Sequence, residues 1–308
     1  MPSFPLHQRI LDWYALESRD LPWRHPDTSA WGVLVSEVML QQTPVIRVEP
    51  VWRQWMSQWP SPAALAAATP GDAVRAWGRL GYPRRALRLH AAADTIVEQH
   101  GGRVPATHDA LLALPGVGSY TAAAVACFAF GLREAVVDTN VRRVLARAVT
   151  GSAQASASLT RAETDLATSL LPADAQTASR WNVAVMELGA LVCSARSPRC
   201  PDCPVQDLCL WKRAGQPAYE GQVRRSQPWN GTDRQARGRL MAVLRAASGP
   251  VTAARLAGAW PVDDAQRDRC LESLVSDGLV EPLSRNRFRL PGARASVRGA
   301  VGRFALPD

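Results

Sequence analysis

The sequence predicts a mainly helical protein of two parts, a large helical body and a small winged-helix-like domain. Apolar residues recur at helical spacing through most of residues 1–215, and no alternating strand pattern appears there. Glycine and proline then interrupt the pattern around residues 214–229, as is typical of a linker. Beyond this interruption, three helical segments precede a strand–turn–strand pattern, which together favour a winged helix with a β-wing.

Prolines, glycines and apolar periodicity predict where each element begins and ends. In the body, the expected helices are residues 4–19, 30–43, 63–68, 72–80, 83–100, 107–113, 120–130, 140–149, 161–170 and 179–192. Pro44 is expected to bend the chain, Gly81 to stop the fourth helix and Gly131 to close the helix of small residues. In the C-terminal part, the expected elements are helices 233–247, 252–260 and 264–278, followed by a β-wing within 279–292.

These elements divide the chain into three segments. Residues 1–215 form the body, with a six-helix lobe at about 28–135 and a second lobe that combines 1–27 with 136–215. Residues 216–232 are the expected linker, and residues 233–308 form the small, Arg-rich domain.

The charge balance favours a polyanionic partner. The 308 residues have a net charge of +9, and residues 221–308 hold 15 Arg against 8 Asp and Glu. Lys212 is the only lysine, so nucleotide bias in the genome also accounts for part of the arginine content. No apolar run is long enough to span a membrane, and the N-terminus lacks the features of a signal peptide. We therefore expect a cytoplasmic protein without a membrane partner.

Four of the six cysteines, Cys193, Cys200, Cys203 and Cys209, lie in one short loop. Disulfides are not expected in a chain without a secretory signal. Four converging thiolates suit either zinc or a [4Fe–4S] cluster. A zinc ribbon usually has two Cys-x2-Cys knuckles and this loop has one, so the spacing favours the cluster and leaves zinc open.

The segment Leu-Pro-Gly-Val-Gly at residues 114–118 predicts a tight turn that binds phosphate. Gly116 and Gly118 allow the backbone around Val117 to present N–H groups, and the next helix adds the positive end of its dipole. A DNA phosphate fits this geometry without contact to a base. The same pattern also occurs as a plain turn between helices.

Seven motifs together resemble one family. LPGVGSYTAAAV, VVDTNVRRVLAR, MELGALVC and the cysteine loop resemble the helix-hairpin-helix DNA glycosylases that have an iron–sulfur loop. LPWR (21–24), SEVMLQQTPV (36–45) and GRLGYPRRALRLH (78–90) resemble the adenine DNA glycosylases of the MutY type within that superfamily. The resemblance covers roughly residues 5–215. It implies a [4Fe–4S] cluster on the four cysteines and a monomer that acts on double-stranded DNA, associated with the bacterial nucleoid.

The resemblance also implies which residues break the N-glycosidic bond. Glu37 would protonate the adenine, and Asp138 would stabilise or covalently trap the sugar cation, with Asn140 and Tyr120 as hydrogen-bonding neighbours. The residues themselves are consistent with this chemistry, because it needs two carboxyl groups in unlike environments and Glu37 lies among apolar residues. The simpler readings are a helix-surface acid for Glu37 and a helix N-terminal acid for Asp138.

A base in a duplex must be flipped out before it can be excised, and the resemblance implies which residues handle it. The adenine pocket would be lined by Leu21, Trp23, Arg24, Val45 and Glu187. Gln42 and Tyr82 would enter the base stack, and Gly116, Val117 and Gly118 would hold the phosphate. Trp23 and Val45 could equally be core residues, and Glu187 a surface helix residue.

Position 120 bears on the type of reaction. In enzymes of the endonuclease III type this position is a lysine that forms a Schiff base, whereas here it is Tyr120, so we expect a monofunctional glycosylase without lyase activity. A tyrosine also occurs there in thymine and uracil mismatch glycosylases, which lack the acid found here as Glu37.

The sequence therefore predicts excision of adenine opposite 8-oxoguanine or guanine. A thymine or uracil mismatch glycosylase is the first alternative. A non-catalytic iron–sulfur DNA-binding protein, and a winged-helix regulator with a cluster sensor, are the others.

The C-terminal part departs from the family. Many of these enzymes carry a β-rich, nudix-like domain that reads 8-oxoguanine, whereas residues 233–308 predict mostly helices. We expect this Arg-rich domain to add non-specific affinity for DNA, with contacts to the lesion as a further hypothesis.

Overall fold

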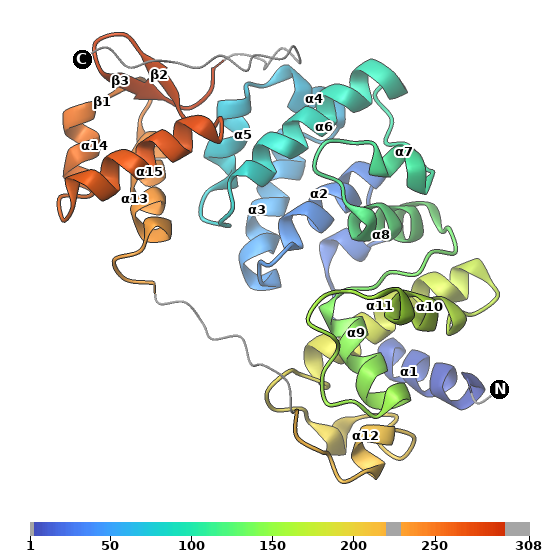
Figure 1. Cartoon of the computed structure of the whole chain (residues 1–308). Coiled ribbons are helices and arrows are strands. Elements are labelled where there is room, and N and C mark those ends of the chain that lie inside the picture. Colours follow the sequence, from blue (N-terminus) through green and yellow to red (C-terminus); the bar gives the residue numbers. More distant parts are fainter. Residues whose placement is uncertain (1–2, 220–228, 293–308) are drawn as a thin grey trace. The chain divides into compact units, whose positions relative to one another are not determined.

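The computed structural model describes residues 3–219 and 229–292 (Figure 1). These residues fall into two compact units, one drawn from 1–64 and 91–227 and the other from 65–90 and 228–308. Much of the expected linker and the last residues of the expected small domain lie outside the described ranges. Among the described residues, no helix has the length and apolar character needed to cross a membrane.

The body is helical, as predicted. Its first helices are α1 (Ser3–Glu17), η1 (Pro22–Arg24), α2 (Ala30–Leu40), α3 (Val45–Gln58), α4 (Pro62–Ala67), α5 (Pro70–Trp77), α6 (Arg84–His100) and α7 (His108–Leu112). The remaining ones are α8 (Ser119–Phe130), α9 (Thr139–Leu145), η2 (Ala146–Thr150), α10 (Arg161–Ser169), α11 (Ala175–Leu191), η3 (Cys200–Asp202) and α12 (Leu210–Arg213). Gly131, in a left-handed conformation, ends α8 as expected.

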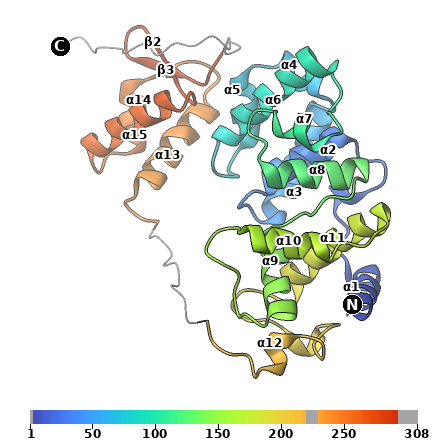
Figure 2. The same ribbon diagram turned by 45° about the vertical axis from the view of Figure 1, so that its right-hand side comes forward.

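Two packing groups hold the first unit together. One is an apolar core that α1, α9 and α11 share, with Ile10, Trp181 and Leu188 at its centre. Figures 1 and 2 both show α9 beside α11. The other is the contact between α2 and α8. Helix α2 is buried along nearly its whole length, from Trp31 to Met39, so the first unit encloses a helix that carries a glutamate, Glu37.

Several boundaries differ from the sequence prediction. Helix α3 was not predicted, because Pro50 lies inside it, yet Val48, Trp52 and Trp55 bury one of its faces. Helix α2 ends at Leu40 rather than at residue 43.

Two further helix boundaries differ from the prediction, one at a glycine and one at an aspartate. Helix α5 ends at Gly78, which has φ of 56°, and not at Gly81. Helix α11 begins at Ala175, because the side chain of Asp174 accepts a hydrogen bond from the N–H of Thr177 and caps it.

The C-terminal part forms the predicted winged-helix-like domain. Its helices are α13 (Asp233–Ala246), α14 (Ala253–Ala259) and α15 (Asp264–Ser276), and its strands are β1 (Val251–Thr252), β2 (Glu281–Leu283) and β3 (Arg287–Arg289). The antiparallel sheet has the order β1-β3-β2, with Val251 opposite Phe288. Three residues, 284–286, connect β2 to β3 in the wing, and two of them, Arg285 and Asn286, have positive φ. Strand β1, only two residues long, was not predicted.

A glycine in α11 allows the close approach of α9. A Cβ atom on Gly189 would lie 2.7 Å from the Cβ of Asn140 and 2.9 Å from its carbonyl oxygen. We expect Gly189→Ala to lower the free energy of unfolding by about 1–3 kcal/mol, because the two helices must move apart. Gly238→Ala in α13 is the matched control, since nothing lies within 4 Å of its Cβ position. Chemical denaturation should show Gly238→Ala to be neutral or stabilising by up to about 1 kcal/mol. Equal effects of the two variants would contradict this account of the α9–α11 contact.

Candidate active site

A cleft of about 1170 Å³ in the first unit brings together most of the residues expected at the site. The expected catalytic residues that line it are Glu37, Tyr120, Asp138 and Asn140. The expected base-pocket residues that line it are Leu21, Trp23, Arg24, Val45 and Glu187. Gln42 and Gly118 also lie on its wall. The loop before α2, the α2–α3 turn, the starts of α8 and α9, and α11 each contribute, so the cleft exists only when these helices pack.

Glu37 is a buried carboxyl group in an apolar helix. It is only 5% exposed, and the hydroxyl of Tyr120 donates a hydrogen bond of 3.0 Å to its Oε2. Burial raises the pKa of Glu37 to about 7, against the hydrogen bond from Tyr120, and the negative charge of Asp138 adds to the rise. The reading of Glu37 as a surface acid is therefore wrong. At neutral pH this carboxyl group can hold a proton and donate it.

Asp138 caps α9 and is held by two donors. The backbone N–H of Val141 donates to its Oδ1 at 2.7 Å, and the side-chain amide of Asn140 donates to its Oδ2 at 2.8 Å. Burial raises the pKa of Asp138, and these hydrogen bonds oppose the rise. Asp138 is thus a helix-terminal acid, as its simpler reading predicts, and it also lines the cleft.

Arg143 holds the side chain of Asn140 in place. Its guanidinium donates to the Oδ1 of Asn140 at 2.6 Å, to the carbonyl of Gly189 at 2.7 Å and to the carbonyl of Cys193 at 2.6 Å. Arg143 was not singled out from the sequence, although it lies in the motif VRRVLAR.

Glu187 is a second buried glutamate in the cleft, and its pKa is shifted in the opposite direction from that of Glu37. Arg19 donates to its Oε1 at 2.6 Å and Arg24 to its Oε2 at 2.8 Å. Burial alone would raise the pKa of Glu187, but the hydrogen bonds from Arg19 and Arg24 lower it to about 2. Glu187 is fully buried, so the reading as a surface residue is wrong. One cleft thus contains a glutamate that can be protonated and another that stays charged.

One buried N–H donor group of Arg24 is not used within the described residues. Its Nη1 atom is buried and makes no hydrogen bond within the described residues, while its Nη2 atom binds Glu187. A buried guanidinium donor without a partner is costly, so a polar atom of a ligand in the cleft would be stabilised there. Sequence reasoning missed Arg19, whose role depends on Glu187, 168 residues away.

The apolar pocket residues lie both on the cleft and in the core. Leu21 and Trp23 are 4% and 7% exposed, and the rings of Trp23 and Trp52 meet edge to face at 5.8 Å. Val45 begins α3 at the cleft wall and is partly exposed. These side chains form an apolar wall that suits a flat, largely apolar ligand.

Gln42 and Tyr82 share a backbone feature. Their φ angles are 55° and 47°, in the left-handed region that side chains other than glycine rarely adopt. Both side chains are exposed, Tyr82 by 49%. Strained turns that present exposed side chains are common where proteins contact ligands. Gln42 belongs to the first unit and Tyr82 to the second.

The hairpin segment forms the expected turn between α7 and α8. Gly116 has φ of 78°, and the N–H of Val117 donates to the carbonyl of Leu114 at 3.1 Å, within the turn itself. Gly118 is the N-cap of α8, and nothing lies within 4 Å of its Cβ position. A phosphate would therefore meet the N–H groups at the start of α8 rather than that of Val117.

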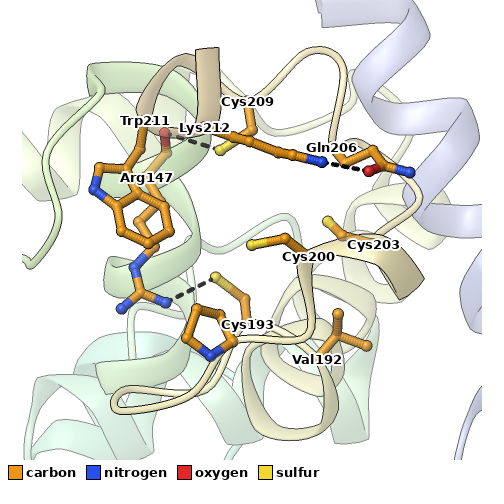
Figure 3. A pocket seen from close by; sticks show the side chains of 10 residues that line it. Arg147, Val192, Cys193, Cys200, Cys203, Gln206, Cys209, Trp211 and Lys212 are labelled. Carbon is orange, nitrogen blue, oxygen red and sulfur yellow. Dashed lines mark hydrogen bonds between the residues drawn. The ribbon is translucent and has the colours of Figure 1, made fainter. Parts of the chain in front are cut away.

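The four cysteines of the loop surround one pocket (Figure 3). Arg147 donates to the Sγ of Cys193 at 3.4 Å, and Gln216 donates to the Sγ of Cys200 at 3.3 Å. Burial, together with the other cysteines, raises the pKa of the Cys203 thiol to about 11, so the thiolate needs a bound cation.

The geometry of the thiols favours a cluster over a single ion. Nowhere in residues 3–219 and 229–292 do three or more His, Cys, Asp or Glu side chains converge closely enough to hold one metal ion. The thiols face a shared space, with Arg147 and Lys212 beside it, which fits an anionic iron–sulfur cluster.

Comparison with known proteins agrees with the geometry. The model of the HhH-GPD superfamily base excision DNA repair proteins matches residues 35–168, and that of the iron–sulfur binding domain of endonuclease III matches residues 193–209. The second match confirms the predicted iron–sulfur loop.

Several relatives are named adenine DNA glycosylase, and two of them match nearly the whole chain. The one from Mycobacterium tuberculosis H37Rv is 56% identical over 284 residues, 92% of each chain. The one from Mycolicibacterium smegmatis is 55% identical over 292 residues, 94% of this chain and 98% of that one. Among solved structures, a thermostable thymine-DNA glycosylase is 29% identical with a TM-score of 0.62, and the match covers 68% of this chain and 97% of that one.

The pKa of Glu37 makes stability depend on pH. Its carboxyl group binds a proton more tightly in the folded chain, so the stabilisation from this proton is full below pH 4.5 and is lost as the pH rises through about 7. Glu37→Gln, which keeps the shape and an acceptor for Tyr120, should gain about 3 kcal/mol over the native chain between pH 4.5 and 8. Denaturation curves at several pH values measure this gain. The exposed Glu98→Gln is the control, and a pH-independent effect of Glu37→Gln would contradict the assigned burial.

The cysteine loop predicts the iron content. Cys203→Ser should lower the iron and acid-labile sulfide bound per chain, because one of four thiolate ligands is lost. Cys270→Ser, which alters a buried cysteine of the other unit, should leave both unchanged. Elemental analysis of the purified proteins measures this. Zinc in place of iron in the native chain would refute the cluster.

Proposed function

This chain belongs to the HhH-GPD superfamily of base excision DNA repair proteins, and within it to the adenine DNA glycosylases; we propose that it excises adenine paired with 8-oxoguanine or guanine in double-stranded DNA. One observation carries the proposal more than any other. A buried glutamate with a pKa of about 7 lines the same cleft as an ionisable aspartate that is held by two hydrogen bonds.

The two carboxyl groups divide the chemistry between them. As the N-glycosidic bond breaks, its electron pair leaves with the adenine, and the protonated Glu37 donates its proton to the leaving base. The sugar becomes a cation, which the Asp138 carboxylate stabilises. Water then adds to the sugar carbon and loses a proton, which the Glu37 carboxylate formed in the first step can accept. Tyr120 and Asn140 hold these carboxyl groups in place through their hydrogen bonds.

A purine suits the remaining groups of the pocket. The buried Nη1 atom of Arg24 can donate to a ring nitrogen, and Glu187 keeps that guanidinium in position. Leu21, Trp23 and Val45 would pack against the faces of the base. Gln42 and Tyr82 would enter the stack from which the adenine has been flipped.

The reaction should stop at base removal. Tyr120 stands where a Schiff-base lysine would be needed, and no lysine lines the cleft among the described residues. The Nζ atom of Lys212, the only lysine, donates to Gln206 at 2.5 Å beside the cysteine loop. A thymine mismatch glycosylase is the second candidate, because the similar solved structure has that name. The buried acid at position 37 favours adenine, since a purine gains more from protonation on leaving.

The iron–sulfur cluster has a supporting role in this proposal. Cys193, Cys200, Cys203 and Cys209 would hold it, and it would supply a rigid anchor for the loop. Arg143 binds both the carbonyl of Cys193 and the side chain of Asn140, so a fixed loop would keep Asn140 in place, and Asn140 in turn binds Asp138. We further propose that the enzyme works as a monomer on DNA, in the cytoplasm at the nucleoid.

Two substitutions test the mechanism. Glu37→Gln and Asp138→Asn should each lower single-turnover excision of adenine opposite 8-oxoguanine by at least about a hundredfold, because one removes the proton donor and the other the charge facing the cation. Binding to the same duplex should persist. Asp174→Asn is the matched control, since Asp174 also caps a helix but lies outside the cleft.

The native enzyme and a substrate panel test the specificity. Adenine opposite 8-oxoguanine or guanine should be released without cleavage of the strand, and thymine opposite guanine should not be released. Faster release of thymine would favour the second candidate. Near-normal excision of adenine by either carboxyl variant would refute the mechanism.

A further inference from the structure

Tyr82 belongs to the same compact unit as the C-terminal domain. Residues 65–90, which include α5 and the loop before α6, group with residues 228–308. The N–H of Gly71 donates to the carbonyl of Pro291 at 2.8 Å, and a Cβ atom on Gly71 would lie 2.5 Å from that oxygen. Arg75 donates to the carbonyl of Ala247 at 2.7 Å. The segment that presents Tyr82 is therefore packed closely against the winged-helix-like domain.

An ion-pair bridge lies near the same loop. The carboxylate of Asp277, just after α15, pairs with Arg84 at the start of α6 at 3.1 Å and with Arg237 of α13 at 2.5 Å. Arg84 lies two residues after Tyr82, so the bridge ties the loop to two helices of the C-terminal domain.

Aromatic rings and guanidinium groups alternate around Tyr82. The guanidinium of Arg85 lies 5.2 Å from the ring of Trp77 and 5.6 Å from that of Tyr82. The guanidinium of Arg234, in α13, lies 5.4 Å from the ring of Tyr82 and 5.3 Å from that of Trp229. Each contact is within the range in which a cation is attracted to an aromatic face.

Arg234 differs from the other charged residues of this group. It is exposed, and it pairs with no carboxylate among the described residues, whereas its neighbour Asp233 pairs with Arg269 at 3.0 Å. It instead lies over the rings of Tyr82 and Trp229. Because the side chain of Tyr82 is half-exposed, this contact with a guanidinium from α13 adds to the contact with Arg85 in restricting the ring.

We propose that Arg234 is a positioning residue for Tyr82, through which the C-terminal domain contributes to the reading of the purine opposite the adenine. The inference rests on the proposed function, in which Tyr82 enters the base stack. A ring held in one orientation stacks well against only some shapes of neighbouring base, so restricting the ring increases discrimination. The winged-helix-like domain then acts on specificity through Tyr82.

Binding of a non-hydrolysable adenine analogue tests this inference. The full-length protein is titrated with duplexes that place the analogue opposite 8-oxoguanine or opposite guanine. The measured ratio is the dissociation constant for the guanine duplex divided by that for the 8-oxoguanine duplex. Arg234→Ala should lower this ratio about two- to fivefold, the size of one cation–π contact. Arg239→Ala is the matched control, because Arg239 is an exposed arginine of the same helix that stacks on Trp260 at 5.9 Å. It should leave the ratio unchanged.

Two further variants separate positioning from other roles. In a Tyr82→Leu background, Arg234→Ala should cause no further change of the ratio, because the ring on which it acts is gone. Gly71→Ala, which disturbs the packing against Pro291 away from Tyr82, should lower the ratio in the same direction as Arg234→Ala. Melting curves confirm that each variant is folded.

Several outcomes would overturn the inference. One is equal weakening of both duplexes by Arg234→Ala with a shallower salt dependence, which would make Arg234 a phosphate contact only. Another is an additive effect in the Tyr82→Leu background. An unchanged ratio for Arg234→Ala would overturn it as well. Absence of adenine excision by the native enzyme would instead refute the proposed function, so the two failures are distinguishable.

Discussion

Burial of one carboxyl group, that of Glu37, is the constraint on which the rest of the cleft depends. Helix α2 carries this glutamate between apolar residues, and packing against α8 removes it from water. The group therefore keeps a proton near neutral pH, with the hydroxyl of Tyr120 as its partner. A cation paired with Glu37 would lower its pKa and remove the proton. Arg19 and Arg24 are instead paired with Glu187, so the pKa values of the two glutamates are shifted in opposite directions.

Asp138 belongs both to a helix terminus and to the cleft. The same carboxylate caps α9 and lines the cleft, so the hydrogen bonds that begin a helix also fix the orientation of a group proposed to react. Asn140, Arg143 and the absence of a side chain at Gly189 keep this arrangement in place. The cysteine loop takes part through the carbonyl of Cys193. The stability of α9 and the orientation of Asp138 in the cleft therefore depend on the same contacts.

The described part of the C-terminal domain consists of three helices and a three-stranded sheet, and in our proposal it acts through the side chain of Tyr82. What it offers is a set of exposed arginines and a close contact with the segment that presents Tyr82. One guanidinium, that of Arg234, is enough to restrict the ring of Tyr82 in this proposal, so a small domain can supply the contact.

The sequence by itself determined the helical body, the winged-helix-like domain and the iron–sulfur loop, because helix periodicity, glycine turns and the cysteine spacing are local patterns. The family resemblance added the prediction of which side chains react. The sequence did not predict α3, because the internal Pro50 suggests a helix break although one face of the helix is apolar. It did not predict β1, because two residues are too few to show an alternating pattern. Only the tertiary structure decided which partners the reactive groups have. Tyr120 lies 83 residues from Glu37, and Arg19 lies 168 residues from Glu187. Protonation states depend on such contacts and on burial, and these arise only when distant segments pack together.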